Sequence, residues 1–140
     1  WLPEALLTLS PLTSARLLFR RTAVRRAAFS DADLEVMAAA LAQPGAMEAM
    51  IHWYRAAFRY PPAGGTPAIS APALLIWAED DVALGVGLTR DLDRWVPDLR
   101  IHYIPDCGHW VQNEAAAEVN EQVLAFLPPT GKKSGAAQLV

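Results

Sequence analysis

The chain has 140 residues, of which 53% are hydrophobic and 19% charged, a composition typical of a globular domain and not of a disordered chain. Its formal net charge of −3 gives no electrostatic basis for binding nucleic acid, and its single cysteine excludes an intrachain disulfide and a cysteine-rich metal site. No apolar run reaches the ~18 residues of a membrane span. We therefore expect no nucleic-acid partner, no membrane span and, from the lone cysteine, a cytoplasmic location.

The N-terminal part of the chain is predicted to be helical. A first, loosely periodic apolar segment is interrupted at Pro11. Ser30 followed by Asp33 fits a capping box, in which a hydroxyl group caps the helix and an acid three residues later completes the pair. The run over residues 34–41 has the spacing of an amphipathic helix, and the Gln-Pro-Gly sequence at 43–45 ends it.

A second helix is predicted over residues 46–58. Its apolar side chains fall on one stripe, which consists of Met47, Met50, Ile51, Tyr54 and Phe58. Five arginines precede both helices and would spread over more than one solvated face: Arg16, Arg20, Arg21, Arg25 and Arg26. The functional alternative for them is a patch that binds phosphate or anionic lipid, but no aromatic residues are interleaved with them and no long apolar stretch is adjacent.

Proline and glycine are dense over residues 61–67, which are predicted to form a loop. Beyond it the pattern alternates strand, helix, strand, helix, over residues 73–78, 87–95, 100–104 and 114–127. The first strand is a continuous apolar run, typical of burial on both faces of a parallel sheet, and the second alternates, which favours a place nearer the edge. This is the order at the end of a doubly wound α/β sheet. Because two parallel strands do not form a stable sheet alone, we expect further strands upstream of Trp1.

Chemically active residues follow both predicted strands. In an open α/β sheet, ligands bind outside the C-terminal ends of the strands. The first strand runs into the acids at 79–81, and the second into the Asp-Cys-Gly-His-Trp sequence at 106–110. An acid that precedes a histidine matches the order of the α/β-hydrolase triad, in which the nucleophile comes first. A buried carboxylate orients the neutral imidazole and stabilises its protonated form.

These segments resemble the soluble epoxide hydrolases. Residues 78–81, with Leu84 following, and residues 106–110 are similar to the acid and histidine loops of that family. The His-Trp-Tyr-Arg sequence at 52–55 resembles its cap-domain motif, in which the tyrosine points at the epoxide oxygen. Residues 118–120 fit as well, and the resemblance covers about residues 43 to 127.

The resemblance implies a two-step reaction. An upstream aspartate attacks an epoxide carbon to form an alkyl-enzyme ester, two cap tyrosines protonate the oxygen, and a histidine then activates the water that hydrolyses the ester. It implies that Asp81 is the orienting acid, His109 the base and Tyr54 one of the two tyrosines. The nucleophile, its elbow, the oxyanion loop and the first tyrosine have no match here and would lie before Trp1. The implied substrate is a small hydrophobic epoxide, and no cofactor is implied.

Each candidate has a structural alternative. Asp81 could be a turn residue or a helix cap, as aspartates at strand ends often are, and Asp80 is the rival acid, although the family pattern selects Asp81. His109 could be a packed loop histidine, in a loop that Gly108 allows to turn tightly. Tyr54 could be a core tyrosine.

The remaining polar and aromatic candidates receive weaker roles. Trp53 and Trp110 are expected to line the substrate pocket or to pack. Cys107 is expected to be structural, because it stands two residues before the base and is badly placed to be activated by it. The acids at 79–81 make a weak metal site, since His109 is the only nearby nitrogen ligand. Surface or structural roles are expected for the other two histidines, His52 and His102.

The resulting prediction is an incomplete domain of the α/β class. It consists of a helical cap portion, a linker, the C-terminal part of an α/β-hydrolase core and a disordered tail, over residues 1–60, 61–72, 73–127 and 128–140. The protein would be part of an epoxide hydrolase, completed by its missing upstream half. The alternatives are another α/β-hydrolase, such as a dehalogenase or a serine esterase, and a truncated product without catalysis. The upstream nucleophile would decide between them.

Overall fold

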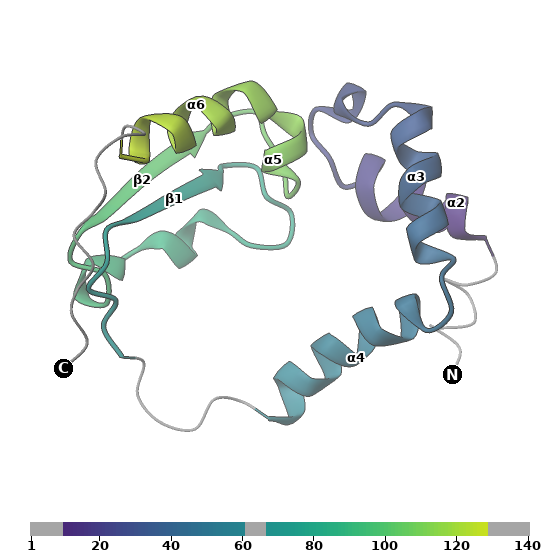
Figure 1. Cartoon of the computed structure of the whole chain (residues 1–140), viewed down its shortest axis with the longest axis horizontal. Coiled ribbons are helices and arrows are strands. Elements are labelled where there is room, and N and C mark those ends of the chain that lie inside the picture. Colours follow the sequence, from purple (N-terminus) through teal and green to yellow (C-terminus); the bar gives the residue numbers. More distant parts are fainter. Residues whose placement is uncertain (1–9, 61–66, 129–140) are drawn as a thin grey trace.

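The computed structural model describes residues 10–60 and 67–128. Half of the predicted linker (61–66), nearly all of the predicted tail (129–140) and the start of the first apolar segment lie outside these residues. The described part consists of a helical region and a strand–helix region, which come together where the short helix α5 (Val111–Glu114) faces the 3₁₀ turn η2 (Arg26–Ala28) (Figure 1). Among the described residues, no helix is long and apolar enough to cross a membrane.

Within the described residues the first helix is α2 (Pro11–Ala15), which begins at the proline that interrupts the apolar segment. Proline is favoured in the first turn because its fixed φ suits a helix and its missing N–H leaves no donor unpaired. The Ser10 side chain caps this end by accepting from the Thr13 backbone N–H at 3.4 Å. The chain continues directly into a π-helical turn, η1 (Arg16–Arg20).

The predicted capping box is confirmed at the start of α3 (Asp31–Leu41). Ser30 Oγ accepts from the Asp33 backbone N–H at 3.1 Å, and Asp33 Oδ2 accepts from the Ser30 backbone N–H at 3.0 Å. The helix ends before the predicted Gln-Pro-Gly break. In α3, Leu34, Ala38 and Leu41 are buried and Met37 is half-buried, so the predicted amphipathic face is the one that packs.

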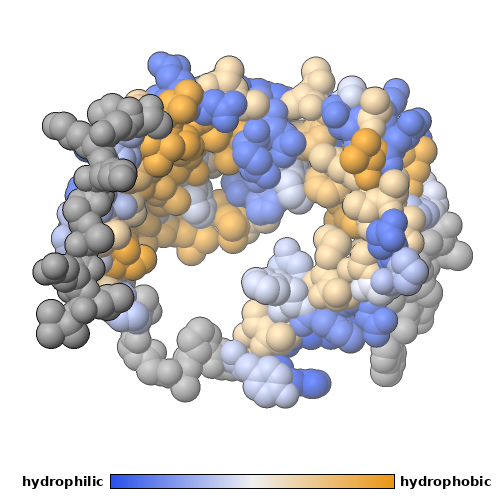
Figure 2. Space-filling view, viewed as in Figure 1, coloured by the Kyte–Doolittle hydropathy of each residue, from blue (hydrophilic) through white to orange (hydrophobic). Residues whose placement is uncertain are grey.

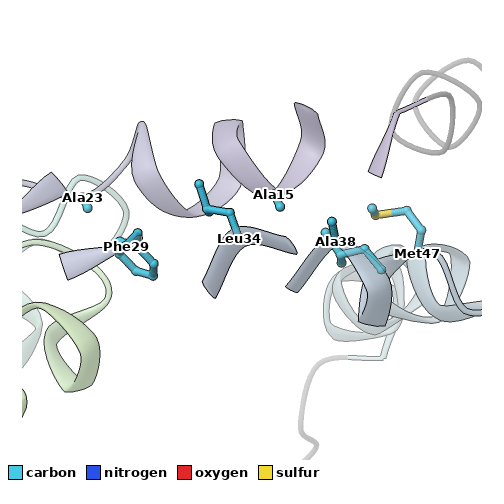
Figure 3. Packing of buried hydrophobic residues seen from close by; sticks show 7 residues of the cluster. Ala15, Ala23, Phe29, Leu34, Ala38 and Met47 are labelled. Atoms are coloured by element: carbon cyan, nitrogen blue, oxygen red, sulfur yellow. The ribbon is translucent and has the colours of Figure 1, made fainter. Parts of the chain in front are cut away.

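The main core lies between α2 and α3. Figure 3 shows side chains from both helices, from the segment between them and, at Met47, from the start of the next helix, gathered in one apolar layer. Its buried members are Ala15, Ala23, Phe29, Leu34, Ala38, Leu41 and Met47. This part of the chain therefore has a hydrophobic cluster of its own.

The next helix, α4 (Ala46–Arg59), begins after Gly45, whose φ of 79° is a left-handed conformation that favours glycine. Of its predicted apolar stripe, Met47 is buried and Ile51 half-buried. The outer part of the stripe, including Tyr54 and Phe58, is exposed among the described residues. The space-filling view is open between α4 and the strands, where hydrophobic residues gather on the strand side (Figure 2).

The two predicted strands are confirmed as β1 (Ala73–Ala78) and β2 (Leu99–Ile104), paired in parallel from Ala73–Leu99 to Ala78–Ile104. Helix α6 (Ala116–Phe126) packs on β1, and His102 of β2 contacts Glu118 of α6, with 2.8 Å between Nε2 and Oε1. The expected burial of β1 on both faces is not met within the described residues: only Ala78 is buried, because β2 is its one paired strand.

Two predicted helices differ from the observed ones. The helix expected over 87–95 is wrong: the segment forms two 3₁₀ turns, η3 (Val86–Thr89) and η4 (Leu92–Arg94), separated at Asp91, which has a φ of 55°. The buried Thr89 hydroxyl bonds to the Val86 carbonyl and to the Tyr103 hydroxyl, and such side-chain bonds compete with a regular helix. The helix expected over 114–127 begins earlier, as α5, and is interrupted at Ala115 before α6.

Candidate active site

The acid loop and the histidine loop leave the sheet at the same edge. Because Ala78 pairs with Ile104 in parallel, both strands end side by side. The loops then bond to each other: Glu79 N–H donates to the Ile104 carbonyl at 3.0 Å, and Asp80 N–H donates to the Cys107 carbonyl at 3.1 Å. This brings the acids after β1 next to the loop that carries His109.

Asp81 and His109 form a direct pair. The Nδ1 atom of His109 lies 3.0 Å and 2.9 Å from the two carboxylate oxygens of Asp81. The Asp81 side chain is 10% exposed and the His109 side chain 30%. With Nδ1 occupied by the carboxylate, Nε2 is the ring nitrogen left for another proton partner, and no described residue bonds to it. Asp80, the rival acid, is exposed, and among the described residues it makes no hydrogen bond or ion pair with His109.

Asp81 also serves its own turn. Its Oδ1 accepts from the backbone N–H groups of Ala83 at 2.7 Å and Leu84 at 2.9 Å. Burial raises the pKa of this carboxyl, but the hydrogen bonds from His109 and from the two backbone N–H groups outweigh it and hold the pKa below the ordinary value. The turn role and the pairing with His109 are therefore combined in one carboxylate, which stays ionised near neutral pH.

Gly108 is needed for a reason other than the predicted one. Its φ is not in the left-handed region, which in this loop is occupied by Asp106 at 50°. The constraint is space, because a Cβ on Gly108 would lie 2.9 Å from Glu114 Oε1 and 3.0 Å from the Val24 backbone nitrogen. Glycine here permits a close approach of two backbone segments, not a tight turn.

Glu114 was not predicted from the sequence and is the most unusual side chain near His109. Its carboxylate is buried and accepts backbone N–H groups from Gly108 and Trp110, and from Val24 and Arg25 in the helical region. Buried acids are uncommon and need such partners. In the sequence Glu114 is only the first residue of the helix predicted over 114–127, and its residue type does not distinguish a buried acid from an exposed one.

Trp110 packs between the helical region and the histidine. Its ring centroid is 4.6 Å from that of Phe19 and 5.0 Å from that of His109, the latter edge-on. Its indole N–H donates to Thr22 Oγ1 at 2.8 Å and to the Leu18 carbonyl at 3.1 Å. Trp110 therefore contacts His109 with its ring, and its indole N–H is hydrogen-bonded to the helical region.

The α4 candidates lie apart from the pair. Trp53 is 77% exposed and Tyr54 65% exposed, and neither makes a hydrogen bond to Asp81 or His109 in the described part of the chain. An open pocket of about 600 Å³ next to α4 is lined by His52 and Arg55, among others, and not by the pair. The structure thus brings Asp81, His109 and Trp110 together, whereas Trp53 and Tyr54 lie on α4 without a hydrogen bond to the pair.

The remaining candidates have structural surroundings. Cys107 is fully buried, and burial together with the nearby Glu114 carboxylate raises the pKa of its thiol, which disfavours a thiolate nucleophile. His52 is exposed, 3.9 Å from Glu48. Within residues 10–60 and 67–128, no three acids, histidines or cysteines gather in a way that could hold a metal ion.

Comparisons with known proteins show that the chain is similar to parts of several hydrolases. No protein-family model matches it. It is 33% identical over 129 residues to "Epoxide hydrolase 3" of Mus musculus, covering 91% of this chain and 35% of the relative. Over 61 residues it is 46% identical to a "2-hydroxy-6-oxononadienedioate/2-hydroxy-6-oxononatrienedioate hydrolase" of Paraburkholderia phymatum, covering 42% of this chain and 20% of the relative.

A solved structure agrees with these relatives. It is described as one of the "Novel epoxide hydrolases belonging to the alpha/beta hydrolases superfamily in metagenomes from hot environments" and superimposes with a TM-score of 0.62 at 31% identity. The superposition covers 72% of this chain and 38% of that one. The chain therefore spans about a third of the length of the mouse relative, at 35%, and a similar share of the solved structure, at 38%.

Proposed function

Because this chain is a C-terminal portion of an α/β-hydrolase and has epoxide hydrolases among its relatives, we propose that it is the part of an epoxide hydrolase that supplies the orienting acid and the water-activating base. The observation that carries the proposal is the Asp81–His109 pair at the ends of two parallel strands. Support for epoxides over other substrates comes from the mouse relative, whose alignment covers 91% of this chain and so includes the helices as well as the pair.

In the proposed reaction His109 acts in the second step. An upstream carboxylate first attacks an epoxide carbon, the C–O bond breaks, and the released oxygen takes a proton from Tyr54 or its partner tyrosine. His109 Nε2 then takes a proton from water, and the hydroxide adds to the ester carbonyl. When the ester bond breaks, the leaving alcohol oxygen receives the proton from His109. The carboxyl proton returns to the tyrosine through water, so that the sum is epoxide plus water to vicinal diol.

Asp81 holds His109 in the form that this step needs. A carboxylate at Nδ1 keeps the proton on that nitrogen and leaves the Nε2 lone pair free, and it stabilises the imidazolium once formed. Since its pKa is held below the ordinary value, Asp81 is ionised wherever a neutral histidine is available. The exposed face of α4 with Trp53 and Tyr54 is proposed to border the substrate as part of a cap, and residues 73–127 are proposed to form the C-terminal part of the core.

The proposal requires neither a cofactor nor a metal, since water and side chains supply every proton and bond. We also propose a cytoplasmic location. Its support is the buried Cys107, which forms no disulfide. We expect the 140-residue chain alone not to turn over an epoxide, because its sequence offers no recognisable nucleophile or oxyanion loop.

The test is a trapped intermediate in the complete reading frame that contains this chain. With an aryl-substituted epoxide, the unchanged protein should release the diol. His109→Gln should stop after the first step, and mass spectrometry should find the protein heavier by the mass of one epoxide. Asp80→Asn, which changes the exposed neighbouring acid, is the matched control and should retain turnover. A His109→Gln protein that still releases diol at the original rate would overturn the role of His109.

A second function is favoured by one observation. The dienedioate hydrolase relative has the higher identity, 46%, over a shorter stretch, so the chain's likeness to hydrolases is not confined to those named for epoxides. A serine hydrolase would use the same acid and histidine with a different nucleophile. In the same assay it would leave epoxides intact and release p-nitrophenol from a p-nitrophenyl ester, and its histidine variant would carry no epoxide adduct.

A further inference from the structure

Glu114 carries four backbone hydrogen bonds on one buried carboxylate. Glu114 is only 7% exposed. The donors are the backbone N–H groups of Val24 at 2.9 Å, Arg25 at 2.8 Å, Gly108 at 3.1 Å and Trp110 at 3.2 Å. No ion pair between Glu114 and a cationic side chain is found among the described residues, and its direct partners there are these backbone N–H groups. These four hydrogen bonds connect the histidine loop to the turn at Val24 and Arg25, and we call them the joint.

Two of these donors stand on either side of His109. Gly108 and Trp110 are its immediate neighbours, and both give their N–H to Glu114, one to each oxygen. The backbone that carries the histidine is therefore fixed from both sides by one carboxylate. Asp81 in turn fixes the ring at Nδ1. Two acids thus divide the task, one holding the backbone and the other the imidazole.

The other two donors belong to the turn between η1 and η2, far away in the sequence. That turn is attached to the histidine loop a second time, because the Arg25 guanidinium donates to the Pro105 carbonyl at 2.9 Å and to the Asp106 carbonyl at 2.8 Å. The space between turn and loop is filled, since a Cβ on Gly108 would meet Val24 as well as Glu114. Displacement of the turn would therefore displace the loop.

We infer that Glu114 is a positioning residue for His109, which makes the alignment of the histidine depend on the turn at Val24 and Arg25. The inference deepens the proposed function and rests on it, because the alignment matters for catalysis only if His109 is the base. The bond geometry itself belongs to the folded chain and can be tested without any substrate.

The experiment is nuclear magnetic resonance of the His109 ring in the full 140-residue chain, comparing the unchanged protein with Glu114→Gln. Glutamine keeps one acceptor oxygen and replaces the other by an NH2 group, which faces at least one backbone N–H donor, so the joint should loosen. We expect the Nδ1–H resonance of His109, held by Asp81, to exchange with water at least tenfold faster in Glu114→Gln. Glu118→Gln is the matched control: it removes an acid four residues on that contacts His102, and it should leave the His109 resonance unchanged.

A second variant covers the case in which Glu114→Gln does not fold. Arg25→Met keeps the stem of the side chain and removes only the bonds to Pro105 and Asp106, and it should increase the same exchange rate by a smaller factor. The inference is overturned if a folded Glu114→Gln, or Arg25→Met in its place, leaves the His109 resonance unchanged. A purely structural role would lower stability without altering the resonance of the folded protein.

Kinetics of the complete reading frame distinguish the positioning role of Glu114 from the proposed function itself. A positioning role predicts that Glu114→Gln lowers kcat at least tenfold with kcat/KM little changed, since His109 acts only in the hydrolysis of the ester, and kcat/KM reports the formation of the ester. Unchanged kcat in a folded variant would overturn it. A reading frame with no epoxide turnover at all would count against the proposed function, while the resonance of His109 would still decide the role of Glu114.

Discussion

His109 Nδ1 lies within 3.0 Å of both carboxylate oxygens of Asp81, in a pair whose members are 28 positions apart. The same carboxylate accepts two N–H groups from its own turn. Every one of these bonds favours the ionised acid, and all of them are lost when the chain unfolds. The pair therefore links the stability of the fold to pH as well as orienting the imidazole.

The pH dependence has a definite direction. The folded pKa of Asp81 lies below its ordinary value of 3.8, so the stabilisation is fully present above that value and is lost as the pH falls through the lower, folded pKa. We expect the free energy of unfolding to decrease from about pH 5 towards pH 2, and to decrease less steeply in Asp81→Asn. Urea unfolding followed by tryptophan fluorescence at several pH values measures this. Asp80→Asn, the exposed neighbour, should keep the original slope; equal slopes in all three proteins would contradict the assignment.

Gly108→Ala should destabilise the fold by about 1–3 kcal/mol, the usual cost of adding a methylene to a filled space. The added Cβ would lie 2.9 Å from Glu114 Oε1 and 3.0 Å from the Val24 backbone nitrogen, and neither partner can move without breaking the joint. Gly87→Ala is the matched control, because nothing lies within 4 Å of its position and its φ is not left-handed. It should be neutral or slightly stabilising in thermal unfolding. Equal effects at the two glycines would refute the close approach.

Leu34→Ala should cost about 2–5 kcal/mol, since the side chain is fully buried between α2 and α3 and its removal leaves a cavity. Val36→Ala, two residues along the same helix and exposed, should change stability by less than about 0.5 kcal/mol. Chemical denaturation of both variants measures the difference. A small effect at Leu34 would mean that the helical cluster adds little to the cooperative fold.

Ser30→Ala removes the hydroxyl half of the capping box, because Asp33 then loses the hydroxyl that it contacts at 2.6 Å as well as the cap of its own N–H, while the backbone N–H at position 30 still donates to the Asp33 carboxylate. The expected loss is about 1 kcal/mol. Glu35→Ala, an exposed position in the second turn of α3, serves as the control and should be close to neutral. Circular dichroism during thermal unfolding reports the shift, and a Ser30 variant as stable as the control would show that the helix does not depend on its cap.

The parts that the sequence predicted well are those with local causes. The apolar run of β1, the alternation of β2 and the Ser30–Asp33 box depend on neighbouring residues, and all were confirmed. The meeting of Asp81 with His109 followed from the rule that parallel strands present their C-terminal ends at one edge. A correct element order was enough to bring these two side chains together.

The parts that were missed depend on distant partners. The helix expected over 87–95 is replaced by 3₁₀ turns, and there the Thr89 hydroxyl bonds to Tyr103, 14 positions away. Glu114 looks like any acid on a helix until its donors at Val24 and Arg25 are known, 90 and 89 positions earlier. Gly108 was predicted for the wrong reason, because a close contact between distant segments has no signature in the local sequence.

The joint between Glu114 and Val24 also has a consequence for the order of events on the ribosome. Closing its 90-residue loop costs about 1 kcal/mol more chain entropy than closing the 28-residue loop between Asp81 and His109. At a synthesis rate of about 5–20 residues per second, the turn at Val24 leaves the ribosome some 5–20 s before its acceptor. For that time its N–H groups are available only to water or to chaperones. The alignment of His109 is thus expected to be a late event in the maturation of the nascent chain.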